Sequence, residues 1–177
     1  MLQGKKVKIR PMEMGDIQLL DVLVRSGDVL HNLTTWLPIS DSLAAKESYF
    51  GERIKKGRSN EPQFAITTLD NTVIGSIGII HTDFRNSETS VHIFVGADYT
   101  GRGYGTEAMR ILVDFIFMEM NIQRVGLNVF DYNERAIASY KKVGFVEEGR
   151  LRQELFRSGK YHDVVQMAVL KEDFIKI

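Results

Sequence analysis

The chain has 177 residues, 44% hydrophobic and 26% charged, which predicts one globular domain over residues 1–177. Its 23 basic side chains balance 23 acidic ones, so no overall field favours nucleic acid or a membrane as partner. The absence of cysteine excludes disulfides, thiolate-bound metals and a cysteine nucleophile. The first residues lack the apolar core of a signal peptide and no apolar run could cross a bilayer, so we expect a soluble protein of the cytoplasm.

The first third of the chain predicts one strand and two helices. Residues 7–10 form a short predicted strand that ends at Pro11. Asp16 is the expected cap of the first helix, and a second helix is expected from about Ser42 to Lys56. An aromatic turn, Thr35-Trp36-Leu37-Pro38, lies between them.

The middle of the chain is rich in β-branched residues and predicts three strands. Residues 63–68 and 73–81 form a hairpin through the polar turn at residues 69–72. Residues 90–95 supply the third strand. Because the connections are short, we expect these strands to be antiparallel.

The last part of the chain predicts two helices between further strands. Ala108, Ile111, Leu112, Phe115 and Met118 recur at helical spacing. Asn133 is the expected N-cap of a later helix, which should end at Gly144. Strands are predicted at residues 124–129, 145–154 and 162–170. The element order therefore predicts an α/β (α+β) fold with a mixed, mostly antiparallel seven-stranded sheet and about four helices.

A glycine-rich turn precedes the first of these late helices. Residues 98–108 read DYTGRGYGTEA, and such a turn presents backbone N–H groups and the positive end of a helix dipole to an anion. A P-loop is excluded because no Gly-Lys-Ser/Thr follows. Residues 103–108 fit the dinucleotide fingerprint G-x-G-x-x-A, and Asp131 lies about where a ribose-binding acid is expected. However, three or four strands precede the turn, whereas that fingerprint normally opens its sheet. A pyrophosphate site for coenzyme A and a merely flexible turn are the other interpretations.

The chain contains TGRGYG at residues 100–105, NERAIASYKKVGF at 133–145, and EGRLR with GKYHD between 148 and 163. These three stretches resemble motifs of the GNAT superfamily of N-acetyltransferases. Residues 100–105, TGRGYG, fit its loop [QR]-x-x-G-x-[GA] from the first glycine onward, with Thr100 in place of Gln or Arg. Residues 133–145, NERAIASYKKVGF, match a second marker of Asn, Ala, Tyr and Gly-Phe in order and spacing. EGRLR at 148–152 and GKYHD at 159–163 resemble the branch that acetylates ribosomal-protein N-termini or polyamines. The resemblance extends from about Val7 to Phe174.

The resemblance implies a single-domain fold with two splayed central parallel strands, at residues 90–95 and 124–129. It implies acetyl-coenzyme A as the acetyl donor. No metal is expected, because no cluster of His and carboxylate residues has metal-ligand spacing. The pantetheine arm would pair with the backbone at Phe94 and Val95, and the Val95 amide is the expected oxyanion donor. Glycines in the turn would let the backbone approach the pyrophosphate closely. The remaining expected cofactor-binding residues are Arg102, Gly103, Tyr104, Gly105, Thr106, Asn133, Ala136 and Tyr140.

Acetyl transfer to an amine requires a neutral amine and a proton for the leaving thiolate. Tyr140 is the expected acid, although a core tyrosine would explain the same residue. Glu88 and His92 share one face of a strand and are candidate bases. A water molecule as base, with His92 a structural sheet histidine, is the alternative.

The acceptor site is expected between the first two helices, where Trp36 and Leu37 would form a wall. The predicted function is acetyl transfer to a primary amine, either a protein N-terminal α-amine or a small amine such as a polyamine. A homodimer is compatible with the resemblance. A non-catalytic sensor of acetyl-coenzyme A and an NAD(P)-binding oxidoreductase remain as alternative functions.

Overall fold

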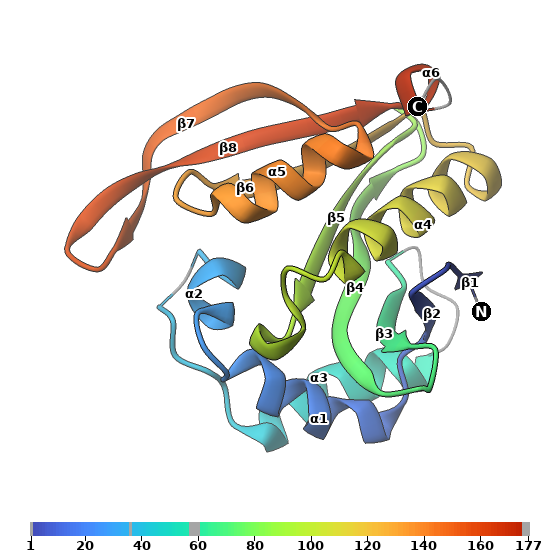
Figure 1. Ribbon diagram of the computed structural model, residues 1–177, viewed down its shortest axis with the longest axis vertical. Coiled ribbons are helices and arrows are strands. Elements are labelled where there is room, and N and C mark those ends of the chain that lie inside the picture. The colour runs from blue at the N-terminus through green and yellow to red at the C-terminus, as the bar shows by residue number, and fades with distance from the viewer. Residues whose placement is uncertain (1, 36, 57–60, 175–177) are drawn as a thin grey trace.

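A computed structural model describes residues 2–35, 37–56 and 61–174. Two strands, three helices and three strands follow one another along these residues before helices and strands begin to alternate (Figure 1). The elements are β1 (Leu2–Gln3), β2 (Val7–Pro11), α1 (Met14–Val24), α2 (Val29–Leu33), α3 (Leu43–Lys56), β3 (Gln63–Thr68), β4 (Val73–Asp83), β5 (Glu88–Val95), a 3₁₀ turn (Ala97–Tyr99), α4 (Tyr104–Glu119), β6 (Arg124–Phe130), α5 (Glu134–Val143), β7 (Val146–Arg157), β8 (Lys160–Leu170) and α6 (Lys171–Phe174).

All the described strands belong to one sheet, in the order β1-β2-β3-β4-β5-β6-β8-β7. Every neighbouring pair is antiparallel except β5 and β6, which confirms the predicted mixed, mostly antiparallel sheet. The sheet has eight strands in the described residues and not seven, because the two-residue β1 pairs with β2. Two short helices, α2 and α6, add to the four expected. This sheet excludes the parallel sheet of dinucleotide-binding folds, so the oxidoreductase interpretation is wrong.

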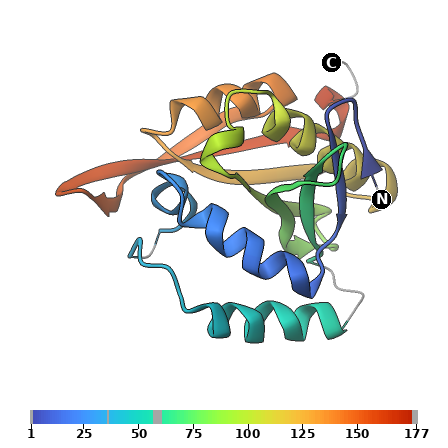
Figure 2. The ribbon, with the colours of Figure 1, turned by 60° about the horizontal axis from the view of Figure 1, so that its bottom comes forward.

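Helices cover both faces of the sheet (Figure 2). Helices α4 and α5 lie on one face, while α1 lies against the other and α3 packs outside α1. The inner face of α4 is apolar: Met109, Leu112 and Ile116 are fully buried. Met118, at an expected core position, is instead 52% exposed, because the buried stripe of the helix runs through Met109 and Phe117.

The two central parallel strands separate along their length. Their pairing includes only residues 88–90 of β5 with residues 124–126 of β6. Beyond Ser90 and Gly126 the described strands share no register, although β5 continues to Val95 and β6 to Phe130. This confirms the expected splay, which opens the sheet at its centre next to the start of α4.

Candidate functional site

A cavity of about 610 Å³ lies where the two parallel strands diverge. We call it the splay cavity. Its walls come from the carboxyl-terminal parts of β5 and β6, the glycine-rich turn with the first turn of α4, one side of α5, and α2. Most of the residues expected to bind the cofactor line this one cavity: Phe94, Val95, Gly103, Tyr104, Gly105, Thr106, Asn133, Ala136 and Tyr140. Arg102 is exposed beside them and is not among the lining residues described.

Two glycines of the glycine-rich turn adopt a backbone conformation that would be strained for a residue with a side chain. Gly101 and Gly103 have φ of 76° and 82°, in the left-handed region that glycine adopts without a steric penalty. Gly103 precedes Tyr104, the first residue of α4, and no side chain in the described residues caps this helix start. The first N–H groups of α4 are therefore available to an anion, in the region where the helix dipole is positive.

The N-terminal segment of the chain holds this turn in place. The Glu107 carboxylate, in the first turn of α4, accepts hydrogen bonds from the backbone N–H groups of Lys5, Lys6 and Val7 at 3.0, 2.7 and 2.9 Å. Lys6 Nζ donates to the Arg102 carbonyl at 3.0 Å. These partners lie about a hundred positions apart in the chain, so sequence analysis missed them. The contacts fix the start of α4 before any ligand binds.

Strand β5 presents one free backbone edge to the cavity. The Gly96 N–H donates to the Ile74 carbonyl of β4 at 2.9 Å, and the Phe94 carbonyl also faces β4. Because backbone groups of successive strand residues point to opposite edges, the N–H and C=O of Val95 face away from β4. That edge has no strand partner in the described residues, since pairing with β6 ends at Ser90. The geometry therefore favours the backbone of Val95 over that of Phe94 for contact with a ligand.

Helix α5 is fixed at its start and joined to α4. The Asn133 side chain accepts a hydrogen bond from the Ala136 N–H at 3.2 Å, which confirms the expected N-cap. The hydroxyl groups of Thr106 and Ser139 lie 2.7 Å apart and join the two helices at the cavity wall. This arrangement holds both helix starts around the same space.

Tyr140 is the phenol that α5 brings to the cavity. Its ring centre lies 5.9 Å from that of Phe145. Desolvation by the surrounding protein raises the pKa of the Tyr140 hydroxyl to about 12. The group therefore keeps its proton at neutral pH, as a proton donor must.

The two candidate bases occupy different places. His92 of β5 lines the splay cavity. His81 of β4, which sequence analysis missed, lines it as well. His81 has φ of 52° at an irregularity in β4 that the sequence alone does not reveal. Glu88 is not among the lining residues described; its carboxylate lies 4.0 Å from Arg124 Nε and is half exposed. The structure thus does not bring Glu88 to the cavity.

The expected acceptor wall is only partly described. Trp36 lies outside the described residues. Leu37 is 74% exposed and is not among the described residues that line the cavity. Asn32, Leu33 and Thr35 line it instead. The side of the cavity where the acceptor is expected is therefore lined by α2 and by Thr35, which follows it.

A second cavity of about 700 Å³ adjoins the first, and we call it the outer cavity. It lies between the α1–α2 turn, the β6–α5 connection and the β7–β8 turn. The lining residues that it shares with the splay cavity are Val29, Asn32, Thr100, Asn133 and Arg135. Its wall contains His162, whose Nδ1 lies 3.3 Å from Asp131 Oδ1. The two cavities therefore share a wall.

Residues 2–35, 37–56 and 61–174 contain neither a metal-ligand cluster nor a membrane-spanning helix. No group of three or more His, Cys, Asp or Glu side chains is arranged to hold a metal ion in that part of the chain. Within the same residues, no helix has both the length and the apolar character needed to cross a membrane.

Comparison with known proteins agrees with this geometry. The chain is 27% identical over 171 residues to the SPbeta prophage-derived uncharacterized N-acetyltransferase YokL of Bacillus subtilis (strain 168), covering 97% of this chain and 93% of the relative. It is 23% identical over 173 residues to the spermidine N(1)-acetyltransferase of Vibrio cholerae, with 97% of each chain covered. The crystal structure of spermidine N-acetyltransferase from Vibrio cholerae in complex with CoA and spermine shares the fold, with a TM-score of 0.86 and 23% identity over 97% of this chain and 99% of that one.

The family model described as acetyltransferase (GNAT) domain matches residues 6–146, which is most of the chain. An acetyltransferase of this family takes its acetyl group from acetyl-coenzyme A and passes it to an amine. The protein belongs to the GNAT acetyltransferase family and is an acyltransferase.

Proposed function

We propose that the splay cavity binds acetyl-coenzyme A and that the acetyl group passes by direct attack to a primary amine. The observation that carries the proposal is the convergence of three features on one cavity: an uncapped helix start, a free edge of β5, and a protonated phenol. Of the two acceptor classes, a protein N-terminal α-amine and a small amine or polyamine, the spermidine N(1)-acetyltransferase relative supports the second.

The residues present fit coenzyme A. The N–H groups from Arg102 to Thr106 would hold the pyrophosphate, since the left-handed glycines leave room for close approach. An added Cβ at Gly105 would lie 3.5 Å from Val95 Cγ2, so the position is open on the side of the cavity. The free backbone edge at Val95 would pair with the amide groups of the pantetheine arm. Asn133 and Ala136 complete this wall.

The proposed chemistry divides between three groups of this chain. The bound donor supplies a thioester, whose carbonyl carbon the neutral amine attacks. The Val95 N–H would donate a hydrogen bond to the carbonyl oxygen as it gains negative charge, a role worth about 3–4 kcal/mol for one well-placed donor. As the carbon–sulfur bond breaks, Tyr140 would give its phenolic proton to the sulfur. His92 would take the proton that the acceptor ammonium loses before the attack, directly or through water. The second proton, which the attacking nitrogen loses as the amide forms, would restore the Tyr140 phenol, directly or through water. The exposed position of Glu88 gives it less support as a base.

The acceptor would enter through the outer cavity. Its described lining carries charges of both signs: Asp28 and Glu134 against Arg135, Arg157 and Lys160. A polyamine would find carboxylates there, and a peptide N-terminus would find partners for its carbonyl and carboxylate groups. The lining is thus compatible with either acceptor class.

The domain organisation, cellular location and oligomeric state are also proposed. We propose that residues 1–177 act as one domain in the cytoplasm, supported by a single sheet that includes strands from β1 to β8. A homodimer is proposed on the family resemblance, and light scattering of the purified protein tests it.

Two measurements test the function in order. Isothermal titration with acetyl-coenzyme A, with NADH and NADPH as controls, should show saturable binding of acetyl-coenzyme A alone. Transfer is then measured with spermidine and with a tetrapeptide that has a free N-terminal serine, and an Nα-blocked copy of the peptide is the control. Binding with no transfer to either amine would favour the sensor alternative. Transfer to the peptide but not to spermidine would select the α-amine class.

A further inference from the structure

The connection between α2 and α3 borders the proposed acceptor route. Within the described residues, it begins at Thr34, directly after α2, and ends at Ser42, directly before α3. Thr35, at its start, lines the splay cavity, and Asn32 of α2 lines both cavities. Thr35 is therefore the described residue through which this connection contributes to the acceptor side.

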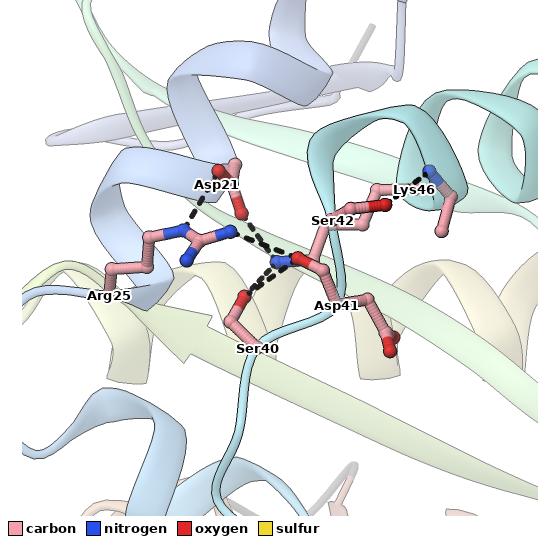
Figure 3. A network of polar contacts seen from close by, with 7 residues as sticks. Asp21, Arg25, Ser40, Asp41, Ser42 and Lys46 are labelled. Carbon is pink, nitrogen blue, oxygen red and sulfur yellow. Dashed lines mark hydrogen bonds and ion pairs between the residues drawn. The ribbon is translucent and has the colours of Figure 1, made fainter.

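A charged cluster holds the end of the connection that leads into α3 (Figure 3). The Asp21 carboxylate of α1 accepts hydrogen bonds from Arg25 Nε at 2.9 Å and from Lys46 Nζ of α3 at 2.5 Å. Each of these cations also reaches the connection. Lys46 Nζ contacts Ser40 Oγ at 2.5 Å, and Arg25 donates to the Asp41 carbonyl at 2.9 Å. Asp21 is thus the acid that binds both cations in the part of the chain that the structure describes.

The ion pair at the centre of this cluster is largely shielded from water. The side chains of Asp21 and Lys46 are 11% and 16% exposed, whereas that of Arg25 is 47% exposed. Burial by itself would raise the pKa of Asp21, but the hydrogen bonds from Lys46 and Arg25 outweigh it and lower this pKa. Removing the carboxylate would leave Lys46 as a shielded cation without its counter-charge, and such a group moves to reach water.

The other end of the connection is held separately. Arg157, which is 6% exposed, donates to the Thr34 carbonyl at 2.6 Å. The Tyr132 hydroxyl donates to the His31 carbonyl at 2.7 Å. Arg157 ends β7 and Tyr132 lies in the β6–α5 connection, and both line the outer cavity. The connection is therefore fastened to the sheet at one end and to α1 and α3 at the other, while Ile39 near its middle is 74% exposed.

We propose that Asp21 is a positioning residue for the acceptor. By orienting Lys46 and Arg25, it holds the α2–α3 connection in position, and this connection borders the acceptor side of the cavities. The inference rests on the proposed function and concerns a residue that touches neither substrate. Since the glycine-rich turn and β5 bind the donor on other elements, loss of Asp21 should affect the acceptor and leave the donor unaffected.

Steady-state kinetics of Asp21→Asn with spermidine or the serine tetrapeptide, whichever the wild-type enzyme acetylates, tests the proposal. We expect KM for the acceptor to rise by about five- to tenfold, with kcat within about twofold. The dissociation constant for acetyl-coenzyme A should not change. Asp21→Glu keeps the charge and should recover most of the wild-type KM. The matched control is Asp70→Asn, which removes an exposed carboxylate that binds Thr68 and Thr72 in the β3–β4 turn.

Hydrogen exchange of the same variants separates positioning from a purely structural role. Backbone exchange over residues 33–43 should become faster in Asp21→Asn by about threefold or more, and it should not change in Asp70→Asn. An unchanged exchange rate, or faster exchange with an unchanged acceptor KM, would overturn the inference while the proposed function stands. If the wild-type protein transfers acetyl to neither amine, the proposed function fails in its own assay and the inference fails with it.

Discussion

Replacing Gly105 by alanine separates what the fold requires at this position from what the donor requires. Gly105 is the second residue of α4, and its φ is not in the left-handed region. An added Cβ would lie 3.5 Å from Val95 Cγ2, an ordinary van der Waals distance. The protein alone therefore accommodates the methyl group. Alanine in place of glycine in a helix should stabilise the fold by up to about 1 kcal/mol, which raises Tm by about 2–4 °C in a domain of this size.

The same methyl group should weaken the binding of acetyl-coenzyme A. If the pyrophosphate approaches the first-turn N–H groups of α4, a Cβ at Gly105 occupies part of that space. Loss of one hydrogen bond to a charged group costs about 1.5–3 kcal/mol, which is roughly a ten- to hundredfold increase in Kd. Stability and affinity should thus change in opposite directions, which a general loss of structure cannot produce.

Gly15→Ala provides the matched control, because Gly15 is the second residue of α1 and its added Cβ would have nothing within 4 Å. Thermal unfolding without ligand and isothermal titration with acetyl-coenzyme A are measured on both variants. Gly15→Ala should match the gain in Tm and leave Kd unchanged. A stabilised Gly105→Ala protein with wild-type affinity would refute the reasoning, since it would show that the donor does not approach this backbone.

Three further substitutions test the site and the fold. Tyr140→Phe should lower kcat by a factor of roughly 10²–10⁴ and leave the Kd of acetyl-coenzyme A unchanged in titration. Because the pKa of Tyr140 is about 12, the phenol stays protonated at neutral pH, and its deprotonation should not reduce wild-type activity there. Asp16→Asn removes the counter-charge of Arg10, 2.7 Å away, from a residue only 4% exposed, and should cost about 2–3 kcal/mol in denaturant unfolding. Burial would raise the pKa of Asp16, but hydrogen bonds from Arg10 and the Glu13 N–H outweigh it and lower this pKa. The stabilisation is therefore present above about pH 4 and is lost as the pH falls through the pKa of Asp16 in the folded state. Equal free energies of unfolding for wild type and variant at pH 7 would contradict this. Thr106→Val should remove the hydroxyl contact with Ser139 and lower the free energy of unfolding by about 1 kcal/mol, with Ser139→Ala giving a similar loss.

Local features of the chain were predictable because neighbouring residues decide them. Asn133 caps α5 and Gly144 ends it with φ of 110°, as the sequence indicates, since both positions depend on the backbone of one helix. The left-handed glycines at the start of α4 follow from the same local chemistry. The order of elements, with short hairpins followed by two helical crossovers, also limits the sheet to a mixed topology.

Which face of a helix is buried required the packed structure. The apolar residues of α4 surround more than one side, so the spacing of Met118 and of Met109 fits a helix equally well. Packing against the sheet buries Met109 completely and leaves Met118 half exposed. Similarly, Glu88 and His92 share a strand face in the sequence pattern, but only His92 lies among the described residues of the cavity wall.

The sequence by itself determined the type of fold, the glycine-rich turn and the phenol on α5, because these follow from periodicity, turn chemistry and a spaced motif within short segments. The tertiary structure alone decided which distant groups meet. It brings the Glu107 carboxylate to three amides near the N-terminus and joins Asp21 to Lys46 across two helices. Such contacts depend on how strands register and helices pack over long separations, and no local pattern of residues records that arrangement.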